Sequence, residues 1–210
     1  MFRRSRRVGA HSSRVVIDEA GVLRSYSGSD TEVSVPGGVT ALADRVFARS
    51  SVTSVELPDT VERIGASAFE GAASLASVTV RDARGQVGEG LPSALRQIGA
   101  RAFLGTRLAV INVPDSVSDI GPGAFALMPS LTGVNIGSDV REGQLVSTFT
   151  ASPKLKAITV KADNASYESV DGVLFTKGRD TLLTYPLGRA GVSYTVPDGT
   201  RALAQESFEG

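Results

Sequence analysis

The chain contains no cysteine and no tryptophan, and its single histidine, His11, lies in an N-terminal tail. The absence of cysteine excludes disulfides, thiolate nucleophiles and cysteine-based zinc sites. Histidine and cysteine supply most acid–base and zinc chemistry near neutral pH, so the body of the chain keeps only carboxylate, lysine, tyrosine or serine options. Without a histidine base, no catalytic triad can be assembled there. We therefore predict a protein that is not an enzyme and that has no cofactor and no metal site.

Long apolar runs are also missing, and charge is unevenly spread. Acidic and basic residues balance at 22 each, but residues 1–14 hold five arginines and no acid. We expect this tail to be disordered, and the mildly acidic remainder is a poor surface for nucleic acid. The tail lacks the apolar run of about 7–15 residues of a secretory signal, and no stretch approaches the roughly 18 apolar residues of a membrane span. The sequence predicts no nucleic-acid partner and no membrane insertion.

What the sequence does contain is a repeat. The residues LPDTVERIGASAF at 57–69 recur as LPSALRQIGARAF at 91–103 and as VPDSVSDIGPGAF at 113–125. Looser copies begin at Val35 and Val196. In these five copies a phenylalanine stands eleven residues after a proline. Such a shared register indicates a repeat protein in which each copy is one structural unit.

A second block, of the form L-x-x-V-x-V, follows the phenylalanines. It begins at Leu75, Leu108, Leu131 and Leu155. Its spacing is that of a leucine-rich-repeat strand, and the proline ends the strand because it has no N–H to give to a ladder. Gly65, Gly99 and Gly121 then permit a tight corner. We predict a β-rich α/β solenoid: a right-handed stack of coils with a parallel sheet, short helical turns at each Ala-Phe pair, and inserted β-hairpins.

The interior of this solenoid should hold one phenylalanine from each coil. Phe69 follows Phe47 by 22 residues, and Phe125 follows Phe103 by the same interval. Because each coil stacks on the next, equivalent residues lie above one another. We therefore expect Phe69, Phe103 and Phe125 to be buried in one stacked column.

These residues closely resemble the BspA-like leucine-rich-repeat family of bacterial surface-type proteins, whose coils have the pattern LTSVTIPDSVTSIGDSAFSGC. The resemblance runs from about Asp18 to Gly210, although the usual cysteine after Phe-x-Gly is replaced, as at Ala72 and Thr106. It divides the chain into a disordered basic tail (1–14), an N-terminal hairpin leading into the array (15–32) and a solenoid (33–210), the last with a loop insertion (81–90) and a hairpin insertion (161–191).

The resemblance also implies a function. It suggests a non-catalytic module that binds a protein or a glycan in adhesion, within a protein located at the cell surface or secreted. A structural spacer that displays other domains is the alternative. The complete reading frame on both sides would distinguish the two, because it would reveal an export signal, a wall anchor or a further domain.

The candidate ligand-binding residues precede the final apolar residue of each strand, where the side chain faces solvent. They are Glu56, Thr79, Asn112, Asn135, Thr159 and Thr195, with Ser34 at the start of the column. One interpretation is a polar recognition strip on the sheet face. The other is an ordinary strand surface, because threonine suits strands and the column contains no aromatic residue and no arginine. Both stay open.

Each of the two insertions also has a functional and a purely structural interpretation. Residues 81–90 contain three glycines but not the sequence of a phosphate loop, and we take them as a plain loop. The later insertion gathers the rings of Tyr167, Phe175 and Tyr185, with Tyr194 nearby. These rings either form a ligand patch or pack the hairpin onto the solenoid. Asn164-Ala-Ser is a formal glycosylation acceptor that we take as incidental in a bacterial family.

The last copy, residues 197–210, stops at the phenylalanine where other copies continue into a strand. Repeat arrays need a terminal coil with a polar outer face, and none is encoded here. We expect either that further coils follow or that this uncapped C-terminal coil is covered by end-to-end self-association. In either case it should be the least protected part of the isolated chain.

Overall fold

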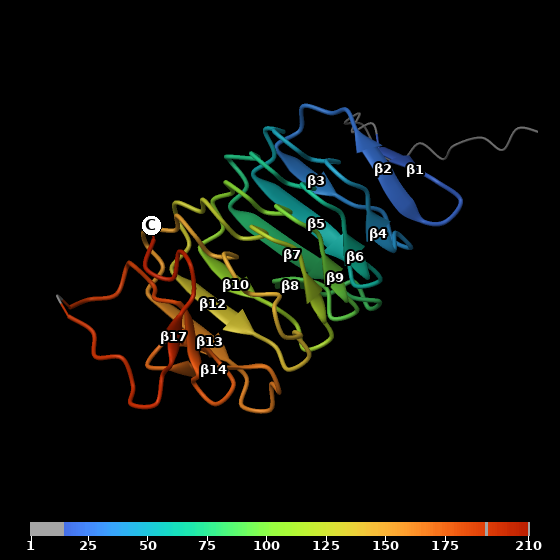
Figure 1. Cartoon of the computed structure of the whole chain (residues 1–210). Helices are drawn as coiled ribbons and strands as arrows, with labels where there is room; N and C mark the ends of the chain where they lie inside the picture. Colours follow the sequence, from blue (N-terminus) through green and yellow to red (C-terminus); the bar gives the residue numbers. More distant parts are fainter. Residues whose placement is uncertain (1–14, 192, 210) are drawn as a thin grey trace, which may run out of the picture.

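The computed structural model describes residues 15–191 and 193–209 as coils stacked along one axis (Figure 1). The basic tail, 1–14, lies outside the described residues, and so does His11. Most coils contribute one strand to a front wall and a two-residue strand to a back wall, with the apolar core between them. The predicted β-solenoid is therefore confirmed.

The front wall is built from the L-x-x-V-x-V strands. Two parallel groups make it up: β3 (Glu32–Ser34), β5 (Ser54–Pro58) and β7 (Ser77–Arg81), then β10 (Val110–Asn112), β12 (Gly133–Ile136) and β13 (Ala157–Val160). Equivalent apolar residues face one another, so that Val134 lies between Ile111 and Ile158. Alternate residues of each strand are buried, as the period of two requires.

The back wall is a second parallel ladder. Its strands are β2 (Val22–Tyr26), β4 (Ala41–Leu42), β6 (Arg63–Ile64), β9 (Gln97–Ile98) and β11 (Asp119–Ile120). At its N-terminal end β1 (Val15–Ile17) pairs antiparallel with β2. Each short strand buries one apolar residue toward the front wall, for example Ile64 and Ile98.

The phenylalanines form the predicted column. Phe69, Phe103 and Phe125 are fully buried, and the column extends to Phe47 on one side and Phe149 on the other. Ring centroids of neighbouring phenylalanines lie between 5.1 and 5.9 Å apart, with nearly parallel planes. The stacked rings therefore connect the successive coils from Phe47 to Phe149.

The prediction of short helical turns, and with it the α/β description, is wrong. The described part of the chain contains no helix. Arg45 and Arg49 flank Phe47 with left-handed backbone, at φ of 60° and 56°, and the next coil repeats this at Ser67 and Gly71. An α-helix requires consecutive right-handed residues, so a left-handed residue every fourth position prevents it.

These turns are stabilised by hydrogen bonds between coils instead. The Phe47 amide donates to the carbonyl of Ala68 at 2.8 Å, and the Phe69 amide donates to Ala102 at the same distance. Further bonds run within the turn, for example from the Ser50 amide to the Phe47 carbonyl at 3.2 Å. An amide that bonds the next coil is unavailable for the i to i−4 bond of a helix.

The glycines of the corners are required by close approach of the coils. A Cβ on Gly121 would lie 2.2 Å from the Ala100 nitrogen, and a Cβ on Gly99 would lie 2.5 Å from the Ala66 nitrogen. Neither glycine has a positive φ. The reason for glycine is therefore lack of space for a side chain, rather than an unusual backbone angle.

The insertion 81–90 is ordered as a hairpin rather than a plain loop. Its strand β8 (Val87–Glu89) pairs antiparallel with β7. Asp82 Oδ1 accepts hydrogen bonds from the amides of Arg84 and Gln86, both at 2.8 Å, and so closes the turn. As a result β7 pairs with β8, and the front wall is divided into its two groups.

A four-stranded sheet ends the described chain. Its strands are β14 (Tyr167–Val170), β15 (Val173–Thr176), β16 (Thr181–Thr184) and β17 (Ala202–Leu203). The first three are antiparallel neighbours, and β17 runs parallel to β16. The strand expected to end at Val196 does not form, and Phe208 stacks on Tyr185 at 5.2 Å outside the phenylalanine column.

Candidate functional site

The predicted column of polar residues is present on the front wall, but it is divided by β8. Glu56 pairs in register with Ser34 and Thr79. In the second group, Asn135 pairs in register with Asn112 and Thr159. Thr195 does not join either set, because it lies in an irregular segment beyond the C-terminal sheet's third strand. The strip ends at Thr159, where the hairpin of β14 and β15 adjoins β13 through a bond from the Ile158 amide to Gly172.

The N-terminal half of the strip is internally neutralised. The Ser34 hydroxyl donates to Glu56 Oε1 at 2.8 Å, and the Arg81 guanidinium contacts both side chains. Arg81 belongs to the strip because it lies two residues after Thr79 on the same face. Sequence reasoning missed it, since it follows the apolar residue that was taken as the end of the strand. These paired charges leave little hydrogen-bonding capacity for a ligand.

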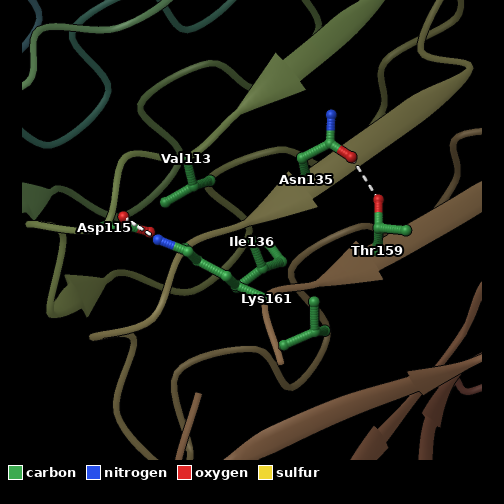
Figure 2. Close-up of a pocket in the computed structure, with 8 residues that line it drawn as sticks. Val113, Asp115, Asn135, Ile136, Thr159 and Lys161 are labelled. Atoms are coloured by element: carbon green, nitrogen blue, oxygen red, sulfur yellow. Dashed lines mark hydrogen bonds and ion pairs between the residues drawn. The ribbon is translucent and has the colours of Figure 1, made fainter. Parts of the chain in front are cut away.

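The C-terminal half is a line of neutral hydrogen-bonding groups. Asn135 Nδ2 donates to Asn112 Oδ1 at 2.6 Å, and the Thr159 hydroxyl donates to Asn135 Oδ1 (Figure 2). The three side chains stand on β10, β12 and β13 at matching positions, so the parallel register sets their spacing. Each amide keeps a further donor or acceptor directed to solvent.

An open hollow of about 290 Å³ lies beside this line. Figure 2 shows Asp115 and Lys161 joined as an ion pair on one side of it, with Asn135 and Thr159 on the other side. Asp115 also accepts a hydrogen bond from the Ser138 amide at 3.2 Å. Contact with Lys161 holds the pKa of Asp115 below its ordinary value, and Asp115 raises the pKa of Lys161. Both groups are therefore charged at neutral pH.

The hollow was only partly foreseen from the sequence. Asn135 and Thr159 were identified from the strand pattern, whereas Asp115 and Lys161 were not. The signal for both is positional: each follows the end of a front strand, Asp115 after Pro114 and Lys161 after Val160. Because parallel strands end at one edge, these positions meet there even though 46 residues separate them.

The aromatic residues of the later insertion do not form one exposed patch. Tyr167 and Phe175 are buried. The Tyr167 hydroxyl accepts from the Gln144 amide at 2.9 Å and donates to the Arg141 carbonyl at 2.8 Å, and burial raises the pKa of Tyr167. Tyr167 thus packs the hairpin onto the solenoid core, whereas Phe175 belongs to a second apolar cluster with Val173 and Leu182.

The other two rings form a small cluster at the C-terminal end. Tyr185 and Tyr194 lie 5.0 Å apart, and the Arg189 guanidinium stands 5.8 Å and 5.9 Å from their ring centres. Burial raises the pKa of Tyr194. Arg189 already occupies the position that a cationic ligand would take over these rings.

Asn164 has a structural role. Its Nδ2 donates to the Gly137 carbonyl at 2.8 Å, and its Oδ1 accepts from the amides of Ser166 and Tyr167, each at 2.8 Å. The residue is 1% exposed. Its amide nitrogen is therefore inaccessible to glycosylation in the folded protein, and the Asn-Ala-Ser sequence serves to fix the hairpin.

The described residues include no group of three or more His, Cys, Asp or Glu side chains placed to hold a metal ion. They also include no helix long and apolar enough to cross a membrane. What the front wall offers is a row of neutral donors and acceptors with an ion pair at its edge. This arrangement is suited to hydrogen-bonding a ligand.

The repeats identified from the sequence match a known family model. Six copies of the BspA type leucine-rich-repeat region match residues 25–91 and 90–172, which together exceed half of the chain. The chain belongs to this family. The match to the BspA-type model ends close to where a second, separate apolar cluster begins, that of Val173, Phe175 and Leu182. Comparison with curated proteins finds no significant match.

Solved structures of bacterial leucine-rich-repeat proteins have the same fold. A protein from Eubacterium ventriosum is 23% identical, with a TM-score of 0.69 over 90% of this chain and 53% of that one. The pneumococcal vaccine antigen PcpA is 22% identical, with a TM-score of 0.63 over 93% and 59%. The Treponema pallidum protein TpLRR is 25% identical, with a TM-score of 0.57 over 73% and 71%. This BspA-type chain thus spans just over half the length of the first two.

Proposed function

We propose that this chain is a non-catalytic binding module that recognises a protein or a glycan through the C-terminal half of its polar strip. The observation that carries the proposal is the line of Asn112, Asn135 and Thr159 beside an open hollow. A rigid row of amide and hydroxyl groups presents donors and acceptors at strand spacing, and so is matched to a ligand rich in hydroxyl or peptide groups.

The rigidity of the row supports a binding role. Each side chain is held by its neighbour on the next strand, so little side-chain entropy remains to be lost when a ligand binds. The Asp115–Lys161 pair adds one charge of each sign at the edge of the hollow. Both groups are about half exposed, so they contribute to ligand orientation more than to affinity.

The proposed location is the cell surface or the extracellular medium. The support is membership of the BspA-type family and the fold shared with PcpA, which is described as a vaccine antigen. In such a setting the module would act in adhesion to a host or to another cell.

A substitution in the middle of the strip tests the proposal. Asn135→Leu removes both hydrogen bonds of the row, and the matched control, Gln97→Leu, places the same change on an exposed strand residue of the back wall. The whole chain would be screened on an array of glycans and on immobilised matrix proteins. We expect Asn135→Leu to weaken the strongest interaction at least tenfold and Gln97→Leu to leave it unchanged. Equal effects of the two changes would exclude the strip as the binding site.

A scaffold role is the second candidate function. It is favoured by the N-terminal half of the strip, where Ser34, Glu56 and Arg81 satisfy one another and leave little for a ligand. Under this proposal the solenoid would hold other domains at a fixed separation. Absence of any array signal for the wild-type chain, together with a monodisperse rigid rod in solution scattering, would favour it.

A further inference from the structure

The insertion 81–90 interrupts the strand pairing of the front wall, while the back wall and the phenylalanine column continue without a break. Behind it, β6 pairs directly with β9, and Phe69 and Phe103 remain stacked at 5.1 Å. In front, β7 pairs with β8, and β10 pairs only with β12. Among the described strands, β8 and β10 therefore each have one edge without a partner.

A groove of about 260 Å³ lies at this opening. Its floor is apolar and includes the buried side chains of Val78, Leu108 and Ile111. Val110 lines one side and is 51% exposed, although it belongs to a strand. Glu89, on the other side, is the one charged residue among those that line the groove.

The register shows which backbone groups of β10 face the groove. The Val113 amide donates to the Asn135 carbonyl at 2.8 Å, so residues 111 and 113 direct their backbone groups toward β12. Successive residues of a strand direct their N–H and C=O groups to opposite sides. Val110 and Asn112 therefore present an amide and a carbonyl each toward the groove.

The same reasoning applies to β8. The Gly90 amide donates to the Val78 carbonyl at 3.0 Å, and Gly88 is the partner of Val80. These even-numbered residues thus bond β7, and Glu89 directs its backbone groups away from β7, on the side of the groove. Two strand edges with alternating donors and acceptors consequently flank an apolar floor.

We propose that this groove binds an extended peptide strand of a partner protein. The backbone of the peptide pairs with the edge of β10 at Val110 and Asn112, as in β-strand addition. One aliphatic side chain of the peptide fills the apolar floor, and a basic side chain lies beside Glu89. The groove shares no lining residue with the polar hollow of the proposed function; Asn112 contributes its backbone here and its side chain to the polar strip. The groove is selective for peptide because a second backbone matches the spacing of the edge groups.

The charge of the groove determines the choice of peptide. Glu89 is negative, and the Ser77 hydroxyl lies 3.3 Å from both of its carboxylate oxygens. A basic residue complements it, whereas an acidic one is repelled. A suitable probe is the hexapeptide LKAITV, the sequence of residues 155–160, acetylated and amidated. It has the form of a front strand of this fold and contains both a lysine and an isoleucine.

The first test is a titration of the whole isotope-labelled chain with this hexapeptide, followed by amide NMR shifts. We expect saturable shifts confined to residues 87–91 and 108–112. No saturable shift, or shifts located at 135–161, would overturn the proposal. Shifts of 108–112 that depend on protein concentration without peptide would assign the groove to a second copy of the chain, and would overturn it equally.

The second test uses a matched pair of variants. Val110→Pro removes the amide that faces the groove and is tolerated at a strand edge, whereas Val110→Thr keeps this amide and the branched side chain. We expect Val110→Pro to weaken binding about tenfold and Val110→Thr to leave it unchanged, as the loss of a backbone hydrogen bond implies. If Val110→Pro disturbs the fold, the hexapeptide N-methylated at alternate amides makes the same comparison on the wild-type chain. Backbone pairing would be refuted if the wild type and both Val110 variants bound the hexapeptide with equal affinity, and if N-methylation of the peptide had no effect.

A third measurement examines the role of Glu89. Glu89→Gln should weaken binding of LKAITV about threefold and should have no effect on the peptide in which glutamine replaces the lysine. Equal effects of Glu89→Gln on both peptides would exclude the proposed charge contact.

Discussion

The residue type tolerated at many positions of this protein is determined by the residue that lies one coil away. Phe103 is buried between Phe69 and Phe125, and Gly121 is opposed by the backbone of Ala100 at a distance that leaves no room for a Cβ. Both effects come from stacking and not from neighbours in sequence. A substitution therefore perturbs the packing of the neighbouring coil, and the free energy of unfolding that it costs depends on the contacts with that coil.

Phe103→Ala should lower the free energy of unfolding by about 3–5 kcal/mol, the usual range for a buried phenylalanine. The matched control is Phe208→Ala, because Phe208 is 43% exposed and stands outside the column. We expect the control to cost about 1 kcal/mol or less. Urea denaturation measures both, and equal losses would contradict the placement of Phe103 in the core.

Gly121→Ala should be strongly destabilising, because its Cβ would lie 2.2 Å from the Ala100 nitrogen. Gly133→Ala is the matched control. Gly121 follows back-wall strand β11 and Gly133 begins front-wall strand β12, but nothing lies within 4 Å of a Cβ added to Gly133. We expect Gly133→Ala, in strand β12, to be neutral or stabilising by up to about 1 kcal/mol. Thermal melting of the two variants checks this, and the reverse order would refute the close approach.

At the scale of elements, the sequence correctly predicted the strands that recur from repeat to repeat. The front strands, their parallel register and the position of Asn112, Asn135 and Thr159 all follow from the recurrence of one strand pattern in successive copies. Helical turns were wrongly expected because the amides around Phe47 bond the next coil, which no local propensity reveals. The strand β8 was missed for a similar reason: its residues are exposed and glycine-rich, and only pairing with β7 makes them a strand.

The hairpin of β14 and β15 is fixed to the solenoid by Tyr167, which gives a test at high pH. Burial raises the pKa of Tyr167 above the ordinary value of 10.0. The folded state therefore retains a proton that the unfolded state loses, so this contribution to stability is complete below pH 10 and is lost as pH rises through the folded pKa. Tyr167→Phe should be less stable at pH 7 by about 1–3 kcal/mol, since the Gln144 amide and Arg141 carbonyl lose their partner.

The same variant should show a smaller loss of stability above pH 10 than the wild type. Urea denaturation at pH 8 and at pH 10.5 measures the difference. Tyr26 and Tyr194, whose pKa values are also raised, remain in both proteins and serve as an internal reference. Parallel pH profiles for the two proteins would mean that Tyr167 is not buried in solution.

At the scale of the whole molecule, stability is distributed unevenly along the stack. Coils in the middle bond neighbours on both sides, whereas the amides of Ala202 and Ala204 bond only the Asp180 and Leu182 carbonyls on the preceding side. Leu203 between them is 56% exposed. The two ends of a repeat array open at lower free energy than its centre.

Hydrogen exchange should show this gradient directly. We expect amides of residues 200–208 to exchange well before those of 111–120, under native conditions and in the whole chain. Equal protection of the two segments in a monomer would contradict it, and protection of 200–208 that increases with protein concentration would reveal end-to-end self-association.

The direction of the hydrogen bonds between coils has a mechanical consequence. These bonds, and the stacked phenylalanines, lie along the axis of the solenoid, so a pull on its two ends loads the coil interfaces in series, each with the same tension. The interface at β8 and β10 carries fewer front-wall bonds than the others, and it would give way first. Each released coil of 22 residues would then lengthen the chain by about 75 Å, at roughly 3.4 Å per residue. If it were held at both ends, the protein would extend in steps under tension, and each step would dissipate mechanical work.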